Sequence, residues 1–302
     1  MYQDGIKLAA FSSDGQCYLF GMLAITPSES REVALIANPE FEAGPAAGHR
    51  ARRLIDGGNP GFSDPFLLMA EDWVPRDAFS RHPHRGIETV TLVLDGALEH
   101  FDSAGNTGVI YTGDAQWMTA GRGVIHNENL LPGTTTHALQ LWVNLPASEK
   151  MAAPRYQHLR GADLPRRREL GVEIRPLSGS SGGVSSPTLN HVPVAAIDAR
   201  VDDGATFEQE FEAGANAFLL VLEGSAIVGR QERRVASGEL AWLTRSDEAP
   251  SVVTIKASGG AMRLLLFAGR PLREPVVFGG PFVMNTQEQI EEAFADFHAG
   301  RF

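Results

Sequence analysis

The chain carries one arrangement of strands and turns twice, and this internal duplication restricts its possible folds more than any other feature. Three segments of the N-terminal half recur in the same order in the C-terminal half: 92–97 with 220–225, 112–118 with 237–243, and 139–143 with 264–268. Gly96 and Gly113 lie 17 residues apart in the first copy, and Gly224 and Gly238 lie 14 apart in the second. The same order at similar spacing predicts two copies of one structural unit.

Each copy has the pattern of antiparallel β-structure. Short apolar runs rich in Val, Leu, Ile, Thr and Trp are separated by Asp-Gly, Gly-Asp, Gly-Arg-Gly and Pro-Gly turns. Many short strands at regular spacing predict a barrel or jelly roll, which leaves few sheet edges open. The expected fold class is therefore all-β, with two tandem jelly-roll β-barrels.

The 302 residues are enough for two domains and can be divided by composition. We expect residues 1–45 to be an extension that adds strands to the first barrel, and residues 46–147 to form that barrel. Residues 148–190 are rich in Pro, Arg, Gly and Ser, which is typical of a linker. Residues 191–302 should form the second barrel.

The second unit should end in a short helix over residues 286–300. Thr286 and Gln289 have the spacing of a capping box, in which each side chain bonds the other residue's backbone N–H. Ile290, Ala293, Phe294 and Phe297 fall on one helical face, so the helix should dock on a barrel.

Charge and cysteine content narrow the function. Lys and Arg total 26 against 37 Asp and Glu, a net charge of −11, which argues against binding to nucleic acid or to an anionic membrane surface. The single cysteine, Cys17, cannot form an internal disulfide and excludes a thiolate-based metal site. No apolar run approaches the ~20 residues of a membrane span. The start of the chain lacks a signal-peptide pattern, so we expect a cytoplasmic protein.

Two short patterns carry candidate metal ligands: His82-Pro83-His84 and His126-Asn127-Glu128. Residues i and i+2 of a strand project to one face, so each pattern presents two ligands side by side. Glu88 has the same parity as His84 and is an alternative carboxylate ligand. Three imidazoles and one carboxylate suit Fe(II), Mn, Co, Ni or Cu, with Zn also possible.

These patterns belong to longer segments that resemble known motifs. His82, His84 and Glu88 followed by Gly96 resemble the first cupin motif, in which that glutamate is often a ligand. The resemblance narrows to the pirin family, covers roughly residues 48–302 and is carried by long segments: 82–90 (HPHRGIETV), 113–128 (GDAQWMTAGRGVIHNE), 139–146 (LQLWVNLP) and 280–286 (GPFVMNT).

The resemblance to pirins implies two tandem cupin domains and a ligand set. In pirins both histidines of His-Pro-His and the His and Glu of His-x-Glu hold one divalent metal. Carried over, these are His82, His84, His126 and Glu128, which favours Glu128 over Glu88. Fe(II) is the expected ion.

The resemblance also implies two alternative functions. Several pirins are quercetinases, which insert dioxygen into a flavonol, and Glu128 would then be the catalytic base as well as a ligand. Other pirins are non-enzymatic partners of regulatory proteins. The first alternative implies a small aromatic substrate, and the second implies a protein partner.

The second copy lacks the metal ligands. Counting from the matched glycines places Glu210, Glu212, Ser251 and Val253 where the first copy has its three histidines and Glu128. We therefore expect one metal ion per chain, in the first barrel. The other histidines are expected to be structural or exposed: 49, 100, 137, 158, 191 and 298.

Overall fold

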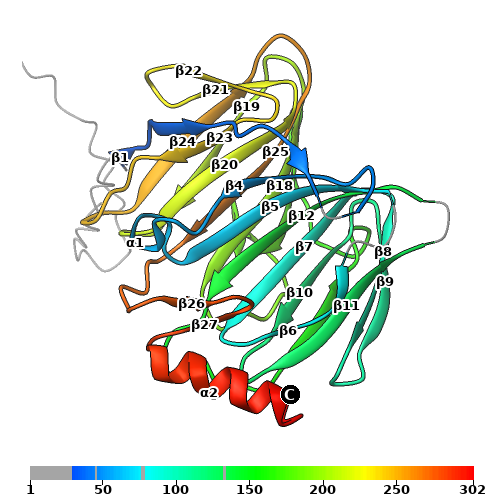
Figure 1. Cartoon of the computed structure of the whole chain (residues 1–302). Helices are drawn as coiled ribbons and strands as arrows, with labels where there is room; N and C mark the ends of the chain where they lie inside the picture. The colour runs from blue at the N-terminus through cyan, green and yellow to red at the C-terminus, as the bar shows by residue number, and fades with distance from the viewer. Residues whose placement is uncertain (1–28, 45, 76–78, 132–133) are drawn as a thin grey trace, which may run out of the picture.

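Two β-barrels lie side by side in the computed structural model, which describes residues 29–44, 46–75, 79–131 and 134–302 (Figure 1). Each barrel has one seven-stranded sheet and one smaller sheet. Beyond short helical turns, the only long helix among these residues is the C-terminal one. The expected all-β class with two tandem barrels and a short C-terminal helix is confirmed.

The first barrel pairs a large sheet with a four-stranded one. In spatial order the large sheet is β13 (Arg155–Leu159), β10 (Ala115–Thr119), β7 (Ile87–Asp95), β12 (Thr136–Asn144), β5 (Phe66–Val74), β4 (Arg50–Ile55) and β3 (Glu42–Ala43). The small sheet is β6 (Phe79–His84), β11 (Val124–Leu130), β8 (Ala97–Asp102) and β9 (Thr107–Tyr111). A short helix, α1 (Pro60–Ser63), precedes β5.

The second barrel repeats this plan. Its large sheet is β14 (Arg167–Glu169), β15 (Val172–Ser178), β18 (Val194–Val201), β25 (Met262–Gly269), β20 (Asn216–Glu223), β23 (Leu240–Leu243) and β2 (Val33–Ala37). Its small sheet contains β1 (Glu29–Ser30), β24 (Ser251–Ala257), β21 (Ser225–Val228), β22 (Arg233–Ala236) and β19 (Thr206–Phe211). Two hairpins complete the described strands: β16 (Ser180–Ser181) with β17 (Val184–Ser185), and β26 (Val277–Gly279) with β27 (Phe282–Met284).

The two large sheets pack face to face through one apolar core. Alternate residues of β7, such as Val90 and Leu92, meet side chains of β20 and β25 from the second barrel, and Phe66 packs edge-on against Phe218 with ring centroids 5.1 Å apart. The opposite faces of the two sheets differ. Apolar residues such as Leu219 fill the second barrel, whereas Thr, Gln and Glu side chains enter the first.

The N-terminal segment does not extend the first barrel as expected. β2 pairs with β23 and β1 pairs with β24, so residues 29–37 belong to the second barrel, and only β3 joins the first. Strand β23 has β20 on one side only, and β2 covers its open edge. The Arg31 guanidinium fixes this segment by donating from Nε to the Ser251 hydroxyl at 2.8 Å. The rest of the predicted extension, residues 1–28, lies outside the described residues.

The predicted linker over residues 148–190 is also wrong. β13 extends the large sheet of the first barrel by pairing with β10, and β15 pairs with β18 in the second. The segment is rich in Arg, Ser and Gly because it consists of strands at or next to the sheet edges and of their turns. Its inward positions are apolar, as at Val172 and Ile174, and these residues are buried. Residues 160–166 join β13 of the first barrel to β14 of the second.

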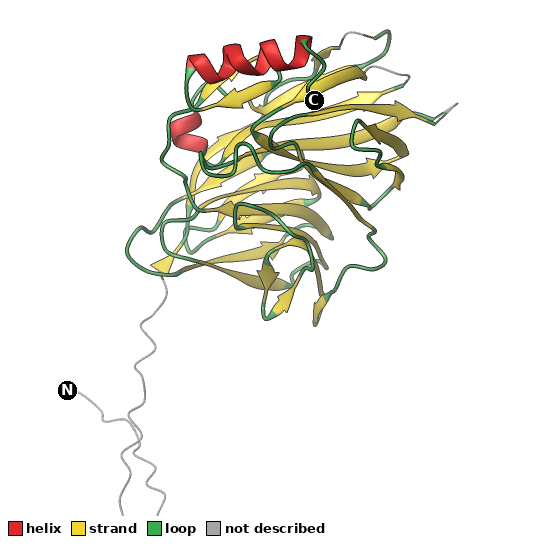
Figure 2. Ribbon diagram, turned by 90° about the horizontal axis from the view of Figure 1, so that it is seen from below, coloured by secondary structure: helices red, strands yellow, loops and turns green. Residues whose placement is uncertain are grey.

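The C-terminal segment returns to the first barrel. Helix α2 (Gln287–His298) begins after the Thr286 N-cap, and the predicted capping box with Gln289 is confirmed. Figure 2 shows α2 lying across one end of the molecule. The preceding β27 bridges to the β6–β7 turn, where the Val283 N–H donates to the Arg85 carbonyl oxygen at 3.1 Å. Across the described residues, no helix is both long and apolar enough to span a membrane.

Lys150 connects this segment to the barrel. Its buried Nζ donates to the carbonyl oxygens of Gly86 at 2.9 Å and Val283 at 2.8 Å, and to Asn144 Oδ1 at 2.6 Å. Three acceptors match the three N–H groups of one ammonium. The side chain thus satisfies buried oxygens from three separate parts of the chain.

Replacing Lys150 with Met should lower the free energy of unfolding by about 3 kcal/mol, because three buried acceptors lose their donor. Denaturant unfolding measures the change. Lys256→Met at an exposed position of β24 is the matched control and should change stability by less than about 0.5 kcal/mol. Similar losses in the two variants would contradict this role for Lys150.

Candidate metal centre

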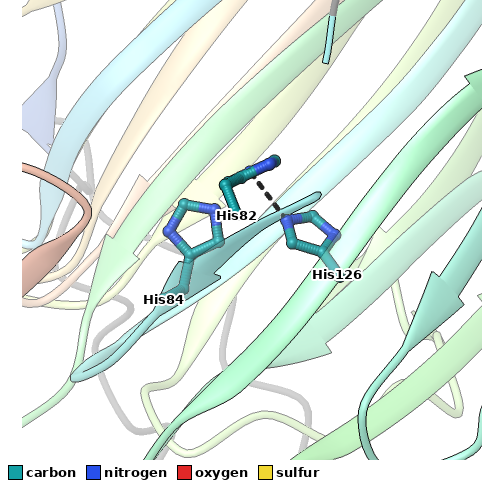
Figure 3. A group of neighbouring side chains, drawn as sticks. All are labelled: His82, His84 and His126. Carbon is teal, nitrogen blue, oxygen red and sulfur yellow. Dashed lines mark hydrogen bonds between the residues drawn. The ribbon is translucent and has the colours of Figure 1, made fainter. Parts of the chain in front are cut away.

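Three histidines gather between two strands of the small sheet in the first barrel. β6 and β11 run antiparallel with His82 opposite His126 and His84 opposite Val124. The ring centroids are 4.4 Å apart for His82 and His126, 4.8 Å for His82 and His84, and 5.1 Å for His84 and His126. Figure 3 shows the three rings clustered around a common point. One nitrogen from each lies within 4.8 Å of the others, so the group could hold a metal ion.

The hydrogen bonds of these rings leave nitrogen lone pairs for a metal. His82 Nδ1 lies 2.8 Å from the Ser80 carbonyl oxygen, and His84 Nδ1 lies 3.3 Å from that of Pro281. Because a carbonyl only accepts, both Nδ1 atoms donate and both Nε2 atoms carry lone pairs. His84 Nε2 is buried without a hydrogen-bond partner, and His126 Nε2 lies 3.0 Å from His82 Nε2. Such converging nitrogens fit a divalent transition metal.

Burial keeps these rings neutral, as ligation requires. It lowers the pKa of His84 to about 3, helped by the neighbouring charge of His82. Burial and the nearby His84 and His82 also hold the pKa of His126 well below its usual value. Burial also lowers the pKa of His82, so all three rings are in the neutral form, with one N–H each, at neutral pH.

Glu128 lies two residues beyond His126 on β11 and is buried. Its Oε1 accepts hydrogen bonds from Thr91 Oγ1 at 3.2 Å and from Gln116 Nε2, and its Oε2 accepts from Gln140 Nε2 at 3.1 Å. Burial raises the pKa of Glu128 to about 7, although these hydrogen bonds oppose the rise. In the structure the carboxylate forms a second potential metal group with His126 and His100, next to the three-histidine group.

The alternative carboxylate, Glu88, has other partners. Its Oε1 accepts from Thr119 Oγ1 at 2.7 Å and from the His191 backbone N–H at 3.4 Å, and it lies 3.8 Å from the Arg155 guanidinium. Burial raises the pKa of Glu88.

The Glu88 side chain lies on the opposite face of β7 from Thr91, which contacts Glu128. On β7 the Thr91 side chain contacts Glu128, and positions three apart on a strand point to opposite faces. His84 and Glu88 do not lie on one strand, because the turn at Gly86, with φ of 79°, separates β6 from β7. The alternation of faces along a strand therefore does not place their side chains on the same side.

His100 belongs to the site, although it was expected to be structural or exposed. It stands directly opposite Glu128 in the β8–β11 pair and is fully buried. Its Nε2 lies 3.3 Å from Asp102 Oδ2, and its ring stacks on Tyr156 with centroids 4.3 Å apart. The signal in the sequence is a further i, i+2 pair, His100 and Asp102, on the strand that follows the Gly96 turn.

The second barrel has apolar or amide side chains at the matching places. Aligning Gly96 with Gly224 and following the strand registers matches His82, His84, His126 and Glu128 with Gln209, Phe211, Val253 and Ile255. This corrects the positions counted from the sequence, because the turn before β24 is longer than the one before β11. The exposed Glu210 points away from the barrel interior, in line with the alternating burial of β19.

A cavity of about 570 Å³ reaches the candidate site. Thr91, Glu128 and Gln140 line it from three strands of the first barrel, and β3 and β4 line it on another side. Glu128, which is grouped with His126 and His100, thus lines a space large enough for a small molecule.

Known proteins share these features. The family described as "Pirin" matches residues 58–143, and the one described as "Pirin C-terminal cupin domain" matches residues 196–302. The chain is 40% identical over 255 residues to "Pirin-like protein 2" of Arabidopsis thaliana, covering 83% of this chain and 79% of that protein. It is 39% identical over 262 residues to human pirin, covering 85% and 89% of the two chains.

Solved structures agree with this comparison. A protein from Geobacillus kaustophilus is 43% identical with a TM-score of 0.80, covering 82% of this chain and all of that one. A structure titled quercetin 2,3-dioxygenase from Acinetobacter baumannii is 31% identical with a TM-score of 0.80, covering 90% of this chain and 98% of that one.

Glu128→Gln should weaken metal binding by at least about 10-fold, whereas Glu88→Gln should leave it unchanged, because only Glu128 lies beside the histidines. Equilibrium dialysis against a buffered divalent metal measures both, and wild-type protein should bind one ion per chain. Loss of metal from the Glu88 variant alone would assign the ligand to Glu88. Two tightly bound ions per chain would contradict a single site in the first barrel.

Proposed function

Because the chain belongs to the pirin family, we propose that it is a metal-dependent dioxygenase that opens flavonol-like substrates in the manner of a quercetinase. The observation that carries the proposal is the position of Glu128, which lies beside His126 of the three-histidine group and lines a cavity. The likeness to the Acinetobacter baumannii protein, whose title names quercetin 2,3-dioxygenase, supports the same reaction class.

The ligands would be His82, His84 and His126 through ring nitrogens and Glu128 through its carboxylate. We favour Fe(II), with Mn, Co, Ni, Cu or Zn as alternatives that suit the same donors. When bound, such an ion supplies Lewis acidity that polarises the substrate's hydroxyl oxygen. Four protein ligands leave room for a small molecule at a five- or six-coordinate ion.

Glu128 is the proposed general base. A flavonol in the cavity would bring its ring hydroxyl group to the Glu128 carboxylate, which takes up the proton. Thr91, Gln116 and Gln140 donate hydrogen bonds to this carboxylate and hold it in place. The deprotonated ring is electron-rich and is oxidised by dioxygen, whose two atoms enter the products, so no external reductant is consumed.

The cavity suits a flat aromatic substrate with several hydroxyl groups. Leu68, Leu98 and Ala138 give it apolar walls, while Arg53 and Asp72 place charged groups on its lining. Apolar walls with a few polar groups are typical of small-molecule sites, where the polar groups fix orientation.

Metal-reconstituted protein should consume dioxygen when a flavonol such as quercetin is added, and this uptake can be measured with an oxygen electrode. His126→Ala should abolish turnover, and Glu128→Gln should lower kcat/KM by at least about 100-fold because the base is lost. His158→Ala, outside the cavity, is the control and should leave turnover unchanged. Absence of turnover with each of the six metals would favour the non-enzymatic, partner-binding alternative.

A further inference from the structure

Two buried ring nitrogens next to the candidate metal centre lack partners in the structure. They are Nδ1 of His100 and Nδ1 of His126. The two rings are neighbours, with centroids 5.4 Å apart and planes tilted by 44°. Buried polar atoms are rarely left unpaired, so two such atoms side by side call for an explanation.

Asp102 sets the proton position on His100. A carboxylate only accepts hydrogen bonds, so the His100 Nε2 that faces Asp102 Oδ2 at 3.3 Å must carry the hydrogen. The carboxylate is itself fixed, since it accepts from the backbone N–H and the side-chain amide of Asn106. His100 Nδ1 therefore carries a lone pair and is an acceptor without a donor.

His126 Nδ1 would be a hydrogen-bond donor without an acceptor. Its Nε2 faces His82 Nε2 at 3.0 Å, which is the side on which the three histidines converge. A neutral imidazole that binds a metal through Nε2 carries its hydrogen on Nδ1. Ligating histidines almost always donate this second N–H to a nearby acceptor, which fixes the ring and makes it a better ligand.

His126 Nδ1–H and His100 Nδ1 can form a hydrogen bond with each other. A ring-to-ring hydrogen bond requires the nitrogens to be about 3 Å apart, and ring centroids 5.4 Å apart are close enough for this if the two Nδ1 atoms turn toward each other. Tyr156 stacks on His100 at an interplanar angle of 15°, which limits how His100 can turn. We therefore expect His126 to be the ring that adjusts.

We propose that Asp102 and His100 form a positioning chain for the metal ligand His126, in which Asp102 fixes the His100 tautomer and His100 Nδ1 accepts the Nδ1–H of His126. This rests on the proposed ligation by His126 but not on the dioxygenase reaction. His100 is a positioning residue in this arrangement, and it does not bind the metal.

The test is metal affinity, measured by competition of Zn(II) against a chromophoric chelator. His100→Phe keeps a ring against Tyr156 but removes the acceptor, and it should weaken binding by about 10- to 100-fold. Asp102→Asn offers an amide N–H to His100 Nε2, which moves the His100 hydrogen to Nδ1, so it should cause a similar loss. His100→Gln retains an acceptor oxygen and should restore part of the affinity.

His158→Phe is the matched control, because His158 also pairs with an aspartate, Asp114, at 3.3 Å but does not contact the histidine group. It should bind Zn(II) as wild type does. Unfolding curves of all variants separate a loss of metal affinity from a loss of fold, and each variant should still bind at most one ion per chain.

Imidazole ¹⁵N NMR of the Zn(II)-loaded protein gives a readout that a purely structural role would not move. The expected spectrum shows His100 as the Nε2–H tautomer and a protected Nδ1–H on His126, which loses its protection in His100→Phe. Wild-type affinity in both His100→Phe and Asp102→Asn would overturn the proposal, as would a His100 nitrogen directly bound to zinc. Wild-type protein that binds no metal would overturn the ligand assignment as well, whereas metal binding without turnover would contradict only the proposed reaction.

Discussion

The apolar contact between the two large sheets is the interaction on which the rest of the structure depends. Val90 and Leu92 of the first barrel and Phe218 of the second belong to one buried core, so each sheet has a face covered by the other. This contact supplies hydrophobic stabilisation that does not require the interior of the first barrel to be apolar. The interior of the second barrel is filled by apolar side chains, whereas the first can hold a polar site.

A polar interior is stable only if its groups find partners. The Glu128 carboxylate finds them, since one hydroxyl and two amide side chains donate to it. The neighbouring histidines keep unpaired nitrogens, at His84 Nε2 and at the Nδ1 atoms of His100 and His126. A metal ion held by the three histidines would give His84 Nε2 a partner.

Each barrel is completed by a segment from the other end of the chain, so the candidate site depends on contacts between residues that are distant in sequence. The C-terminal hairpin returns to the first barrel and brings the Pro281 carbonyl oxygen to His84 Nδ1, nearly 200 residues away in sequence. Lys150 and the Arg85–Asp296 ion pair, with 2.8 Å between Arg85 Nη2 and Asp296 Oδ2, hold this segment in place. The orientation of a candidate ligand in the first domain thus depends on the end of the second.

Local and repeated features could be predicted from the amino-acid sequence: the two barrels, the capping box at Thr286, and the histidine pairs that strand periodicity places on one face. It could not determine the contacts between distant segments. The turn at Gly86 breaks the strand parity that made Glu88 an alternative ligand, and the open edge of β23 decides where β2 pairs. His100 reaches the site only because β8 lies beside β11. Which strands pair depends on the sheet edges and faces that remain uncovered in the folded barrels. Strand pairing between distant segments therefore follows from tertiary packing and cannot be read from local sequence patterns.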